Sequence, residues 1–379
     1  MTRLTPDLIE GVPDDTLDLD SKLMKMCGKT VKQLALEGAG VDHDVDFSGF
    51  RVAVIPITSG MGVIGGFSKS VDAIVRRLGM QSYVTDGTDV NGFAQAIRDK
   101  VDMIMMADDA MFVAYNTHVE SYTNNSWGTA MGYSVALKNA AGGVDGKDVL
   151  VIGAGLVGTE AVQILKSWGA SVSVTDIKFE KAKALEDRFG VKALGDVESA
   201  LASHKYILNA APAIFPGRLI QEGAVVSTPG VPHYFDEESR RKAKAIIHDP
   251  LEIGTAMMAV NSAMFSLRRS GIWHMAPDRI ALSRRESIQG HEHGGSRLGD
   301  LRRIPGARMG DRAEEVQREP FPILAGLHGH HDVCQPDVHS VRHGGRDVGG
   351  RGLLDLDRTG RRVRHDRGHP AVQGEAGTC

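Results

Sequence analysis

Short apolar runs alternate with segments of helical periodicity along two stretches of the chain. Uninterrupted apolar runs predict buried strands, and apolar residues on one face predict the helices between them. In the first stretch, strands are predicted at 51–58, 81–85 and 101–106, and helices at 66–78 and 92–98. In the second, strands are predicted at 148–152, 171–175, 192–194, 206–209, 224–227 and 246–248, and helices at 157–168, 179–189, 197–201 and 237–243. Such alternation predicts parallel βαβ units with right-handed crossovers.

Further helical segments surround these two stretches. Residues 5–40 and 126–141 have helical periodicity, and 255–265 predict a final helix. We therefore expect an α/β protein in which helices and a small α/β substrate domain (1–142) precede a Rossmann dinucleotide-binding domain (143–250). A C-terminal helix (251–266) is expected to pack at the domain junction, with a cleft between the two domains.

The composition changes abruptly after residue 266. Every lysine lies before that point, whereas most arginines and histidines lie beyond it. A GC-rich gene read in the wrong frame produces this bias, so we expect 267–379 to be a low-order, frameshifted tail. A natural disordered extension and a folded third domain are the alternatives. His328, His330 and His331 lie in this tail with no periodic helix or strand to hold them, so no metal site is predicted.

Composition also limits which cellular compartment and which classes of binding partner are expected. No apolar run is long enough to span a membrane, and the N-terminus has no signal-peptide core. Cys27, Cys334 and Cys379 are scattered and form neither a disulfide framework nor a C-x-x-C metal site. The acidic character of residues 1–266 argues against a nucleic-acid partner. We expect a cytoplasmic protein that binds a small molecule.

The pattern G-x-G-x-x-G occurs twice, and its second occurrence, at 153–158, follows a predicted strand directly. Asp176 stands about 20 residues further on, at the end of the next strand, where a carboxylate accepts a hydrogen bond from a ribose 2′-hydroxyl. Because this carboxylate repels a 2′-phosphate, NAD is expected rather than NADP, although the basic Lys178 nearby weakens that preference. A plain βα turn is the alternative. The expected cofactor-binding residues are Gly153, Gly155, Leu156, Val157, Gly158, Asp176, Ile177, Ala211 and Pro212.

The first occurrence, at 60–65, departs from the dinucleotide pattern. Thr58 and Ser59 separate the strand from Gly60, and Pro56 removes a backbone donor near the end of the strand. Backbone N–H groups and the Ser59 hydroxyl could bind a small polar ligand such as a carboxylate. We expect a substrate-binding loop here, with a structural turn and a second nucleotide site as the alternatives.

Several segments of the chain resemble a known family. They are the loop Ile-Pro-Ile-Thr-Ser-Gly-Met-Gly-Val-Ile-Gly-Gly-Phe-Ser at 55–68, Met-Ala-Asp-Asp at 106–109, Asn-Asn at 124–125, Ser-Thr-Pro-Gly-Val-Pro at 227–232 and Pro-Leu-Glu-Ile-Gly-Thr-Ala at 250–256. Together they strongly resemble the pyrrolysine-ring-forming dehydrogenases, the PylD family. The resemblance covers roughly residues 1–266 and leaves the tail outside it.

This resemblance implies an NAD-dependent amine dehydrogenase, expected as a homodimer, that completes pyrrolysine biosynthesis. The family's substrate is a lysine whose ε-nitrogen carries a 3-methyl-D-ornithyl group. Its terminal amine is oxidised by hydride transfer to NAD, and the imine or the derived aldehyde condenses with the other ornithyl amine. Ammonia and water leave as the pyrroline ring closes.

The matching positions also imply residue roles. Ser59 and Asn125 resemble substrate hydrogen-bonding residues, and Asp108 resembles the carboxylate that holds the reacting ammonium group or the ammonia formed from it. Leu4 resembles part of an N-terminal helix that closes over the substrate and excludes water. Each has a simpler explanation: Asp108 and its neighbour Asp109 could cap a following helix, Asn125 could be a turn residue, and Leu4 could be a core residue.

Two other functions compete with this one. Another NAD-dependent amino-acid dehydrogenase of similar architecture would need a Lys or His as acid or base in the cleft. Lys69 and Lys138 are the plausible lysines, while His118 and His248 do not stand at a strand end that faces the cleft. A non-catalytic NAD-binding module would bind the cofactor without producing NADH.

Overall fold

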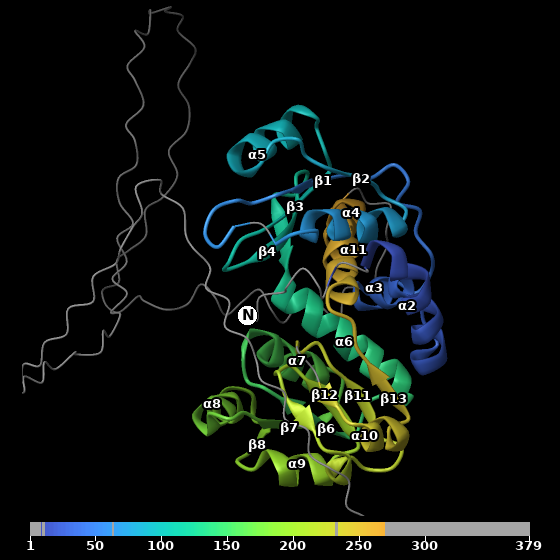
Figure 1. Ribbon diagram of the computed structural model, residues 1–379, viewed down its shortest axis with the longest axis vertical. Coiled ribbons are helices and arrows are strands. Elements are labelled where there is room, and N and C mark those ends of the chain that lie inside the picture. Colours follow the sequence, from blue (N-terminus) through green and yellow to red (C-terminus); the bar gives the residue numbers. More distant parts are fainter. Residues whose placement is uncertain (1–8, 10–11, 63, 232–233, 270–379) are drawn as a thin grey trace, which may run out of the picture. The chain divides into compact units, whose positions relative to one another are not determined.

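The computed structural model describes residues 9, 12–62, 64–231 and 234–269 (Figure 1). The predictions for Leu4, for the frameshifted tail beyond residue 269 and for its histidine cluster lie outside these residues. For the described part, the predicted α/β class with a Rossmann-type second half is confirmed.

The first sheet has five strands in the order β2-β1-β3-β4-β5. β1 (Arg51–Ile55) pairs in parallel with β2 (Gln81–Val84) and with β3 (Met103–Ala107). β4 (Phe112–Asn116) and β5 (Ser121–Asn124) continue the sheet with antiparallel pairing. Because β1 and β3 are parallel neighbours, the loop after β1 and the turn after β3 lie next to each other.

The β4–β5 hairpin corrects the expectation of purely parallel units in the first half. Along β4, buried residues alternate with half-buried ones, which is the pattern of a strand in a sheet with one well-covered face. Because Val113 and Tyr115 at the half-buried positions are also apolar, residue type does not display this alternation. The two strands place α6 directly after the edge of the first sheet.

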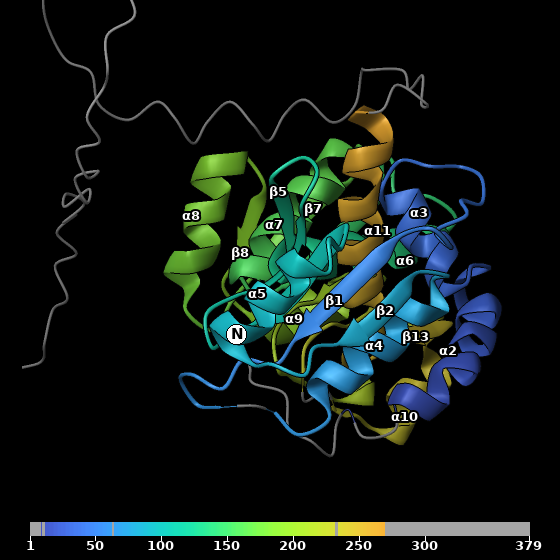
Figure 2. The same ribbon diagram turned by 90° about the horizontal axis from the view of Figure 1, so that it is seen from above.

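Within the predicted helical segment 5–40, the described residues include the helices α2 (Val12–Cys27) and α3 (Val31–Gly38). Gly28 has a φ of 71°, and Thr30 starts α3 with a capping box. α4 (Phe67–Arg77) packs on one face of the first sheet and α5 (Asp89–Arg98) on the other, as Figure 2 shows.

The second sheet has six parallel strands in the order β13-β11-β9-β6-β7-β8. Numbered from β6 and read from the opposite edge, this is the doubly wound order 3-2-1-4-5-6, and the strand order reverses between β6 and β9. The strands are β6 (Asp148–Ile152), β7 (Ser171–Thr175), β8 (Lys192–Leu194), β9 (Tyr206–Asn209), β11 (Val225–Ser227) and β13 (Ala245–Ile247). A ligand crevice is expected outside the carboxyl ends of β6 and β9.

Helices join these strands, and two very short strands add a small second ladder. The helices are α7 (Leu156–Ser167), α8 (Phe179–Phe189), α9 (Val197–Ser203) and α10 (Glu237–Lys242). β10 (Ile214–Phe215) pairs with β12 (Tyr234–Phe235), and a 3₁₀ turn, η1 (Gly217–Leu219), follows β10. The sequence does not predict these last three because such short elements have no measurable periodicity.

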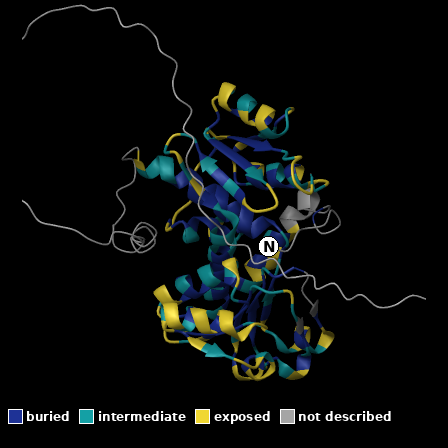
Figure 3. Cartoon of the chain, turned by 90° about the vertical axis from the view of Figure 1, so that its left-hand side faces the viewer, coloured by how far each residue is buried: buried dark blue, intermediate teal, exposed yellow. Residues whose placement is uncertain are grey.

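Two long helices form the centre of the fold. α11 (Glu252–Arg269) is buried continuously from Glu252 to Met264 and packs on α6 (Asn125–Ala141), α3 and α4. A Cβ on Gly128 of α6 would lie 2.5 Å from Met258 Cγ of α11, so glycine permits this close approach. Figure 3 shows buried positions along the strands and inner helices. No helix in the described ranges is long and apolar enough to cross a membrane.

Candidate active site

A pocket of about 550 Å³ lies where strand ends of both sheets come together. Its lining includes the loop after β1, the turn after β3 and the N-terminal part of α6. Segments that follow β6, β9, β11 and β13 complete the lining. Open α/β sheets bind their ligands in this position, outside the carboxyl ends of parallel strands.

The structure brings most of the predicted site residues to this pocket. They are Ser59, Asp108 and Asn125 from the first half and Gly155, Leu156, Val157 and Pro212 from the second. The other predicted cofactor residues are not part of the lining: Gly153 follows β6, Gly158 lies in the first turn of α7, Asp176 and Ile177 follow β7, and Ala211 follows β9. Residues that are far apart in the sequence thus share one cavity, and their individual roles remain predictions.

The second glycine turn joins β6 to α7 with no intervening residues beyond 153–155. A Cβ on Gly158 would lie 1.8 Å from the carbonyl oxygen of Gly153, so only glycine allows α7 to pack this closely on the turn. A Cβ on Gly155, by contrast, would meet nothing within 4 Å. The open space left there gives an anion access to the backbone N–H groups at the start of α7.

Asp176 lies at the end of β7, beside this turn. Its Oδ2 accepts a hydrogen bond from Ala154 N at 2.8 Å, and its Oδ1 accepts one from Lys178 N at 2.8 Å. Ile177 and Leu156 are 96% and 68% exposed, which is unusual for large apolar side chains. A fixed carboxylate flanked by exposed apolar groups at a glycine turn fits the ribose and base of a dinucleotide.

The first glycine loop is built differently. Residues 56–66 separate β1 from α4, and Gly66, at the N-cap of α4 with a φ of 83°, provides no side-chain cap. Ser59 is exposed on this loop and lines the pocket. Because no helix begins directly after the strand, the geometry favours a substrate loop over a second dinucleotide site.

Asp108 lies in the turn that connects β3 to β4. Its Oδ1 accepts hydrogen bonds from Ala110 N at 2.8 Å and from Met111 N at 2.7 Å, and its own N–H bonds to Met111 O at 3.0 Å. A strand follows this turn, so the simpler explanation of the two acids as helix caps is wrong. The carboxylate is held at the pocket by its own turn.

Asn125 is the first residue of α6, and its backbone position is set by the residue before it. The Asn124 side chain caps the helix by accepting a bond from Trp127 N at 2.9 Å. Asn125 Oδ1 accepts a bond from Thr129 Oγ1 at 3.0 Å, and both residues line the pocket. Asn125 therefore presents its amide from the helix side of the cavity.

The charged groups of the pocket are all of one sign. Its lining contains the carboxylates Asp108, Asp109 and Asp249 and, among the residues that the structure describes, no Lys, Arg or His. Carboxylates without cations favour a positively charged ligand, because a bound anion would be desolvated beside like charges. The cavity therefore suits an ammonium group better than a free carboxylate.

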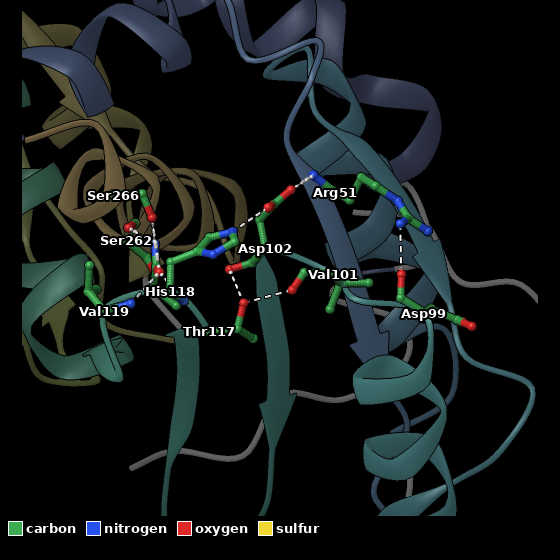
Figure 4. Close-up of polar contacts among 10 residues, drawn as sticks. Arg51, Asp99, Val101, Asp102, Thr117, His118, Val119, Ser262 and Ser266 are labelled. Atoms are coloured by element: carbon green, nitrogen blue, oxygen red, sulfur yellow. Dashed lines mark hydrogen bonds and ion pairs between the residues drawn. The ribbon is translucent and has the colours of Figure 1, made fainter. Parts of the chain in front are cut away.

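The lysines considered for the competing dehydrogenase function, and the two histidines set aside for it, are not part of the pocket lining. Lys138 Nζ pairs with Glu37 Oε1 at 2.5 Å and lies over the Trp168 ring, and Lys69 is not part of the lining. His118 Nε2 lies 2.5 Å from Asp102 Oδ1, at the amino end of β3 (Figure 4). Asp108 follows the carboxyl end of that strand, roughly 20 Å from Asp102 at 3.3 Å per residue.

A buried polar network in the wall of the pocket was not predicted from the sequence. Tyr133 Oη donates to Asp249 O at 2.5 Å and accepts from Asp249 N at 2.9 Å. The Asp249 carboxylate in turn caps α11, since Oδ1 accepts from Leu251 N at 2.8 Å and Oδ2 from Ile253 N at 2.9 Å. The spacing Asp-x-x-Glu before an apolar run is a capping-box pattern and could have indicated this helix start.

Glu252, the next acid of this network, is 4% exposed. Burial, reinforced by the neighbouring charge of Asp249, raises the pKa of Glu252 to about 8. Arg77 opposes this shift, with Nη1 3.3 Å from Glu252 Oε2 and Nη2 2.5 Å from Asp20 Oδ2. The folded protein therefore favours the protonated form of Glu252.

Replacing Glu252 with glutamine is expected to flatten the pH dependence of stability. Between about pH 5 and 8 an unfolded glutamate loses its proton while folded Glu252 keeps it. The free energy of unfolding therefore falls with rising pH, by at most about 1.4 kcal/mol per unit. Urea denaturation across this range measures the slope. Glu180→Gln, at an exposed site in α8, is the control, and an equally steep slope in Glu252→Gln would contradict the expectation.

Comparison with known proteins shows which families the two halves of the chain resemble. Residues 9–123 match the family model of the N-terminal domain of the pyrrolysine biosynthesis protein PylD. Residues 126–277 match the C-terminal domain of the alanine dehydrogenase/PNT family. Shikimate dehydrogenase from Aquifex aeolicus is a weaker structural likeness, with 18% identity, a TM-score of 0.40 and coverage of 58% of this chain and 97% of the other.

Two curated relatives are similar over most of their own length. Pyrrolysine synthase from Methanosarcina barkeri is 31% identical over 259 residues, which span 68% of this chain and 97% of the relative. Pyrrolysine synthase from Methanosarcina acetivorans is 30% identical over 259 residues, with 68% and 98% covered. The chain therefore belongs to the pyrrolysine synthase family, the PylD proteins of pyrrolysine biosynthesis, and its second half matches a dehydrogenase-type C-terminal domain.

Proposed function

We propose that the protein catalyses the final step of pyrrolysine biosynthesis, the NAD-dependent oxidation of the terminal amine of L-lysine-Nε-3-methyl-D-ornithine. It would thus be an oxidoreductase acting on a CH–NH2 group. The observation that carries the proposal is a pocket whose charged side chains are all acidic and which Asp108 lines together with the cofactor-side residues Leu156 and Val157. Such a pocket suits a substrate with several amines, and family membership supports the choice of substrate.

The residues at the second glycine turn fit a nicotinamide dinucleotide. The open space at Gly155 and the N-terminus of α7 would hold the pyrophosphate, and Asp176 would accept hydrogen bonds from the adenosine ribose. When bound, NAD supplies the hydride acceptor for the oxidation.

The protein's own groups prepare the amine for the loss of hydride. Hydride leaves a C–H bond next to nitrogen most easily when that nitrogen is neutral, so the ammonium proton must be accepted by Asp108 or by a water bound to it. Ser59 and Asn125 orient the substrate by hydrogen bonds. Apolar residues of the lining, such as Ile64, Phe67 and Phe112, exclude water from the reacting carbon.

The later steps need few protein groups. Oxidation converts the CH–NH2 group to an imine, with the hydride leaving to the cofactor and a proton to the base. The imine or the aldehyde derived from it condenses with the second ornithyl amine. If the amine attacks the imine directly, ammonia leaves as the pyrroline ring closes. By the aldehyde route, hydrolysis takes up one water and releases ammonia, and ring closure releases that water again.

Absorbance at 340 nm tests the proposal directly. Purified protein, NAD and the lysine–methylornithine isopeptide should produce NADH, and mass spectrometry should detect the ring-closed product. NADH formed with L-alanine or another simple amino acid but not with the isopeptide would point to a different dehydrogenase. NAD binding with no NADH from either substrate would point to a non-catalytic module.

We further propose NAD rather than NADP as the cofactor, on the basis of Asp176. Asp176→Ser is expected to raise the NADP:NAD ratio of kcat/KM by about tenfold or more, because the repelling carboxylate is gone and each tenfold corresponds to about 1.4 kcal/mol. Initial rates with both cofactors measure the ratio. Lys178→Ala should shift it the opposite way, and an unchanged ratio in Asp176→Ser would refute this role.

We also propose a cytoplasmic homodimer in which residues 1–142 bind the substrate and 143–250 bind NAD. The family resemblance supports the dimer. Light scattering on the purified full-length chain tests it by giving the mass of one or two copies.

A further inference from the structure

Two carboxylates hold the first glycine loop on either side of Ser59. On one side, Asp89 accepts bonds from Thr58 N at 2.8 Å and from Thr58 Oγ1 at 2.5 Å. On the other, Asp109 Oδ2 accepts a bond from Met61 N at 2.8 Å. The loop is therefore tied both to the start of α5 and to the turn after β3.

The contact between the loop and Asp109 is too close for any side chain at residue 60. Gly60 has a φ of +69°, and a Cβ built on it would lie 2.2 Å from Asp109 Oδ2. A residue with a Cβ would have to displace the carboxylate that bonds Met61. The glycine and the acid thus form one packing unit, which we call the Gly60–Asp109 contact.

Backbone strain on the other side of Ser59 is consistent with this tight attachment. Asp89 has a φ of 51°, a left-handed conformation that is unfavourable for a residue other than glycine. Its carboxylate makes both bonds to Thr58. The loop is thus held by two independent sets of hydrogen bonds, one of them from a residue with a strained backbone. This indicates that the loop has a defined position and does more than connect β1 to α4.

Asp108 and Asp109 therefore have different partners although they are adjacent. Asp108 Oδ1 bonds to the N–H groups of its own turn, whereas Asp109 Oδ2 bonds to the loop. Since Asp109 is covalently next to Asp108 and bonds a residue two positions from Ser59, its bond fixes these two pocket residues relative to each other.

We propose that Asp109 is a positioning residue, whose bond to Met61 sets the separation between Ser59 and Asp108. This inference rests on the proposed function, in which those two residues meet the substrate. In this positioning role Asp109 acts through an acceptor oxygen, while its charge adds to the acidic character of the pocket. A displacement of about 1 Å between reacting groups can lower the rate by about 100-fold, so this bond affects turnover without touching the reacting atoms.

The Asp109→Asn and Asp109→Ala variants separate positioning from a direct charge effect. Asparagine retains an acceptor oxygen, so we expect kcat for the isopeptide to stay within about threefold of wild type, while the lost pocket charge appears as a higher KM. Alanine should in addition lower kcat by about 10- to 100-fold. NADH affinity and the thermal midpoint should stay near the wild-type values in both. Asp86→Ala, at an exposed acid after the neighbouring strand β2, is the matched control and should behave as wild type.

The Gly60→Ala variant tests the same contact from the other side. It should resemble Asp109→Ala, because the added Cβ displaces the carboxylate from Met61. The double variant should be little worse than either single one, since removing Asp109 also removes the overlap. Fully additive losses would contradict the proposal, as would an Asp109→Asn variant as impaired as Asp109→Ala.

Hydrogen exchange of the Met61 amide provides a readout that does not depend on activity. Exchange should accelerate in Asp109→Ala and stay slow in Asp109→Asn. If wild type forms no NADH from the isopeptide, the proposed function fails, but the exchange data still decide whether Asp109 positions the loop. Equal exchange in wild type and Asp109→Ala would overturn the inference even if turnover is observed.

Discussion

Replacing Asp108 with asparagine is expected to lower kcat for the isopeptide by about 10²- to 10⁴-fold, the usual range for loss of a general base. The substitution isolates the charge. The asparagine Oδ1 can still accept the bonds from Ala110 and Met111 that shape the turn, while an NH2 group replaces the second carboxylate oxygen. An NH2 group cannot accept the ammonium proton, so the amine stays charged and resists hydride loss. Stopped-flow measurement of NADH formation in a single turnover follows this step directly.

The affinity for NADH serves as the control for Asp108→Asn. Fluorescence titration should give a dissociation constant close to wild type, because the glycine turn and Asp176 belong to the other sheet. The adjacent Asp109→Asn variant is the matched comparison, because it also removes one carboxylate charge from the pocket but leaves Asp108 in place. Unchanged turnover in Asp108→Asn would sink its assignment as proton acceptor.

The second half of the fold could be predicted almost residue by residue. The strands at 148–152 and 171–175 have the bounds that the apolar runs predict. These strands lie in a parallel sheet with helices joining its strands, so all but their first residues are buried. Burial on both faces is the condition under which a strand appears in the sequence as a continuous apolar run.

The antiparallel hairpin of β4 and β5 could not be predicted in the same way. In β4, Val113 and Tyr115 are only half-buried and alternate with buried Phe112 and Ala114. Alternation of this kind is a strand signal, but here the less buried positions are also apolar, so it does not stand out by residue type. The pairing partners then depend on contacts with α11 that no local pattern contains.

In the candidate site, too, local sequence motifs predict some features, whereas contacts between residues far apart in the sequence are not predicted. Ser59, Asp108 and Asn125 were expected together because their surrounding motifs resemble one family, and they line one pocket. The bond between Tyr133 and Asp249 joins residues 116 positions apart, and neither residue has a local pattern that names its partner. Only the capping spacing of Asp249 and Glu252 is visible in the sequence.

The two copies of the G-x-G-x-x-G pattern differ in what their glycines permit. In the second copy, Gly158 lets α7 pack against the turn after β6, which directs the helix N-terminus at the pocket. In the first copy, Gly60 lets a carboxylate approach the loop. Identical spacing therefore supports cofactor binding in one place and loop attachment in the other, because the neighbours of the missing Cβ differ.

Replacing Gly158 with alanine is expected to weaken NADH binding by about 100-fold or more and to lower the free energy of unfolding. The new Cβ would lie 1.8 Å from the carbonyl oxygen of Gly153, so α7 must move away from the turn. That movement displaces the helix N–H groups that would hold the pyrophosphate. Fluorescence titration with NADH measures the affinity, and urea denaturation measures the stability.

Gly155→Ala provides the matched control, because the same methyl group is added at a position with a different environment. A Cβ on Gly155 meets nothing within 4 Å, so the variant should keep its stability and yet bind NADH more weakly, since the methyl group occupies the space left for the ligand. We expect Gly158→Ala to lose both stability and NADH affinity, and Gly155→Ala to lose NADH affinity alone. This difference would separate the effect of helix packing from that of ligand contact. Normal NADH affinity in Gly158→Ala would show that α7 tolerates the displacement and that its N-terminus does not hold the dinucleotide.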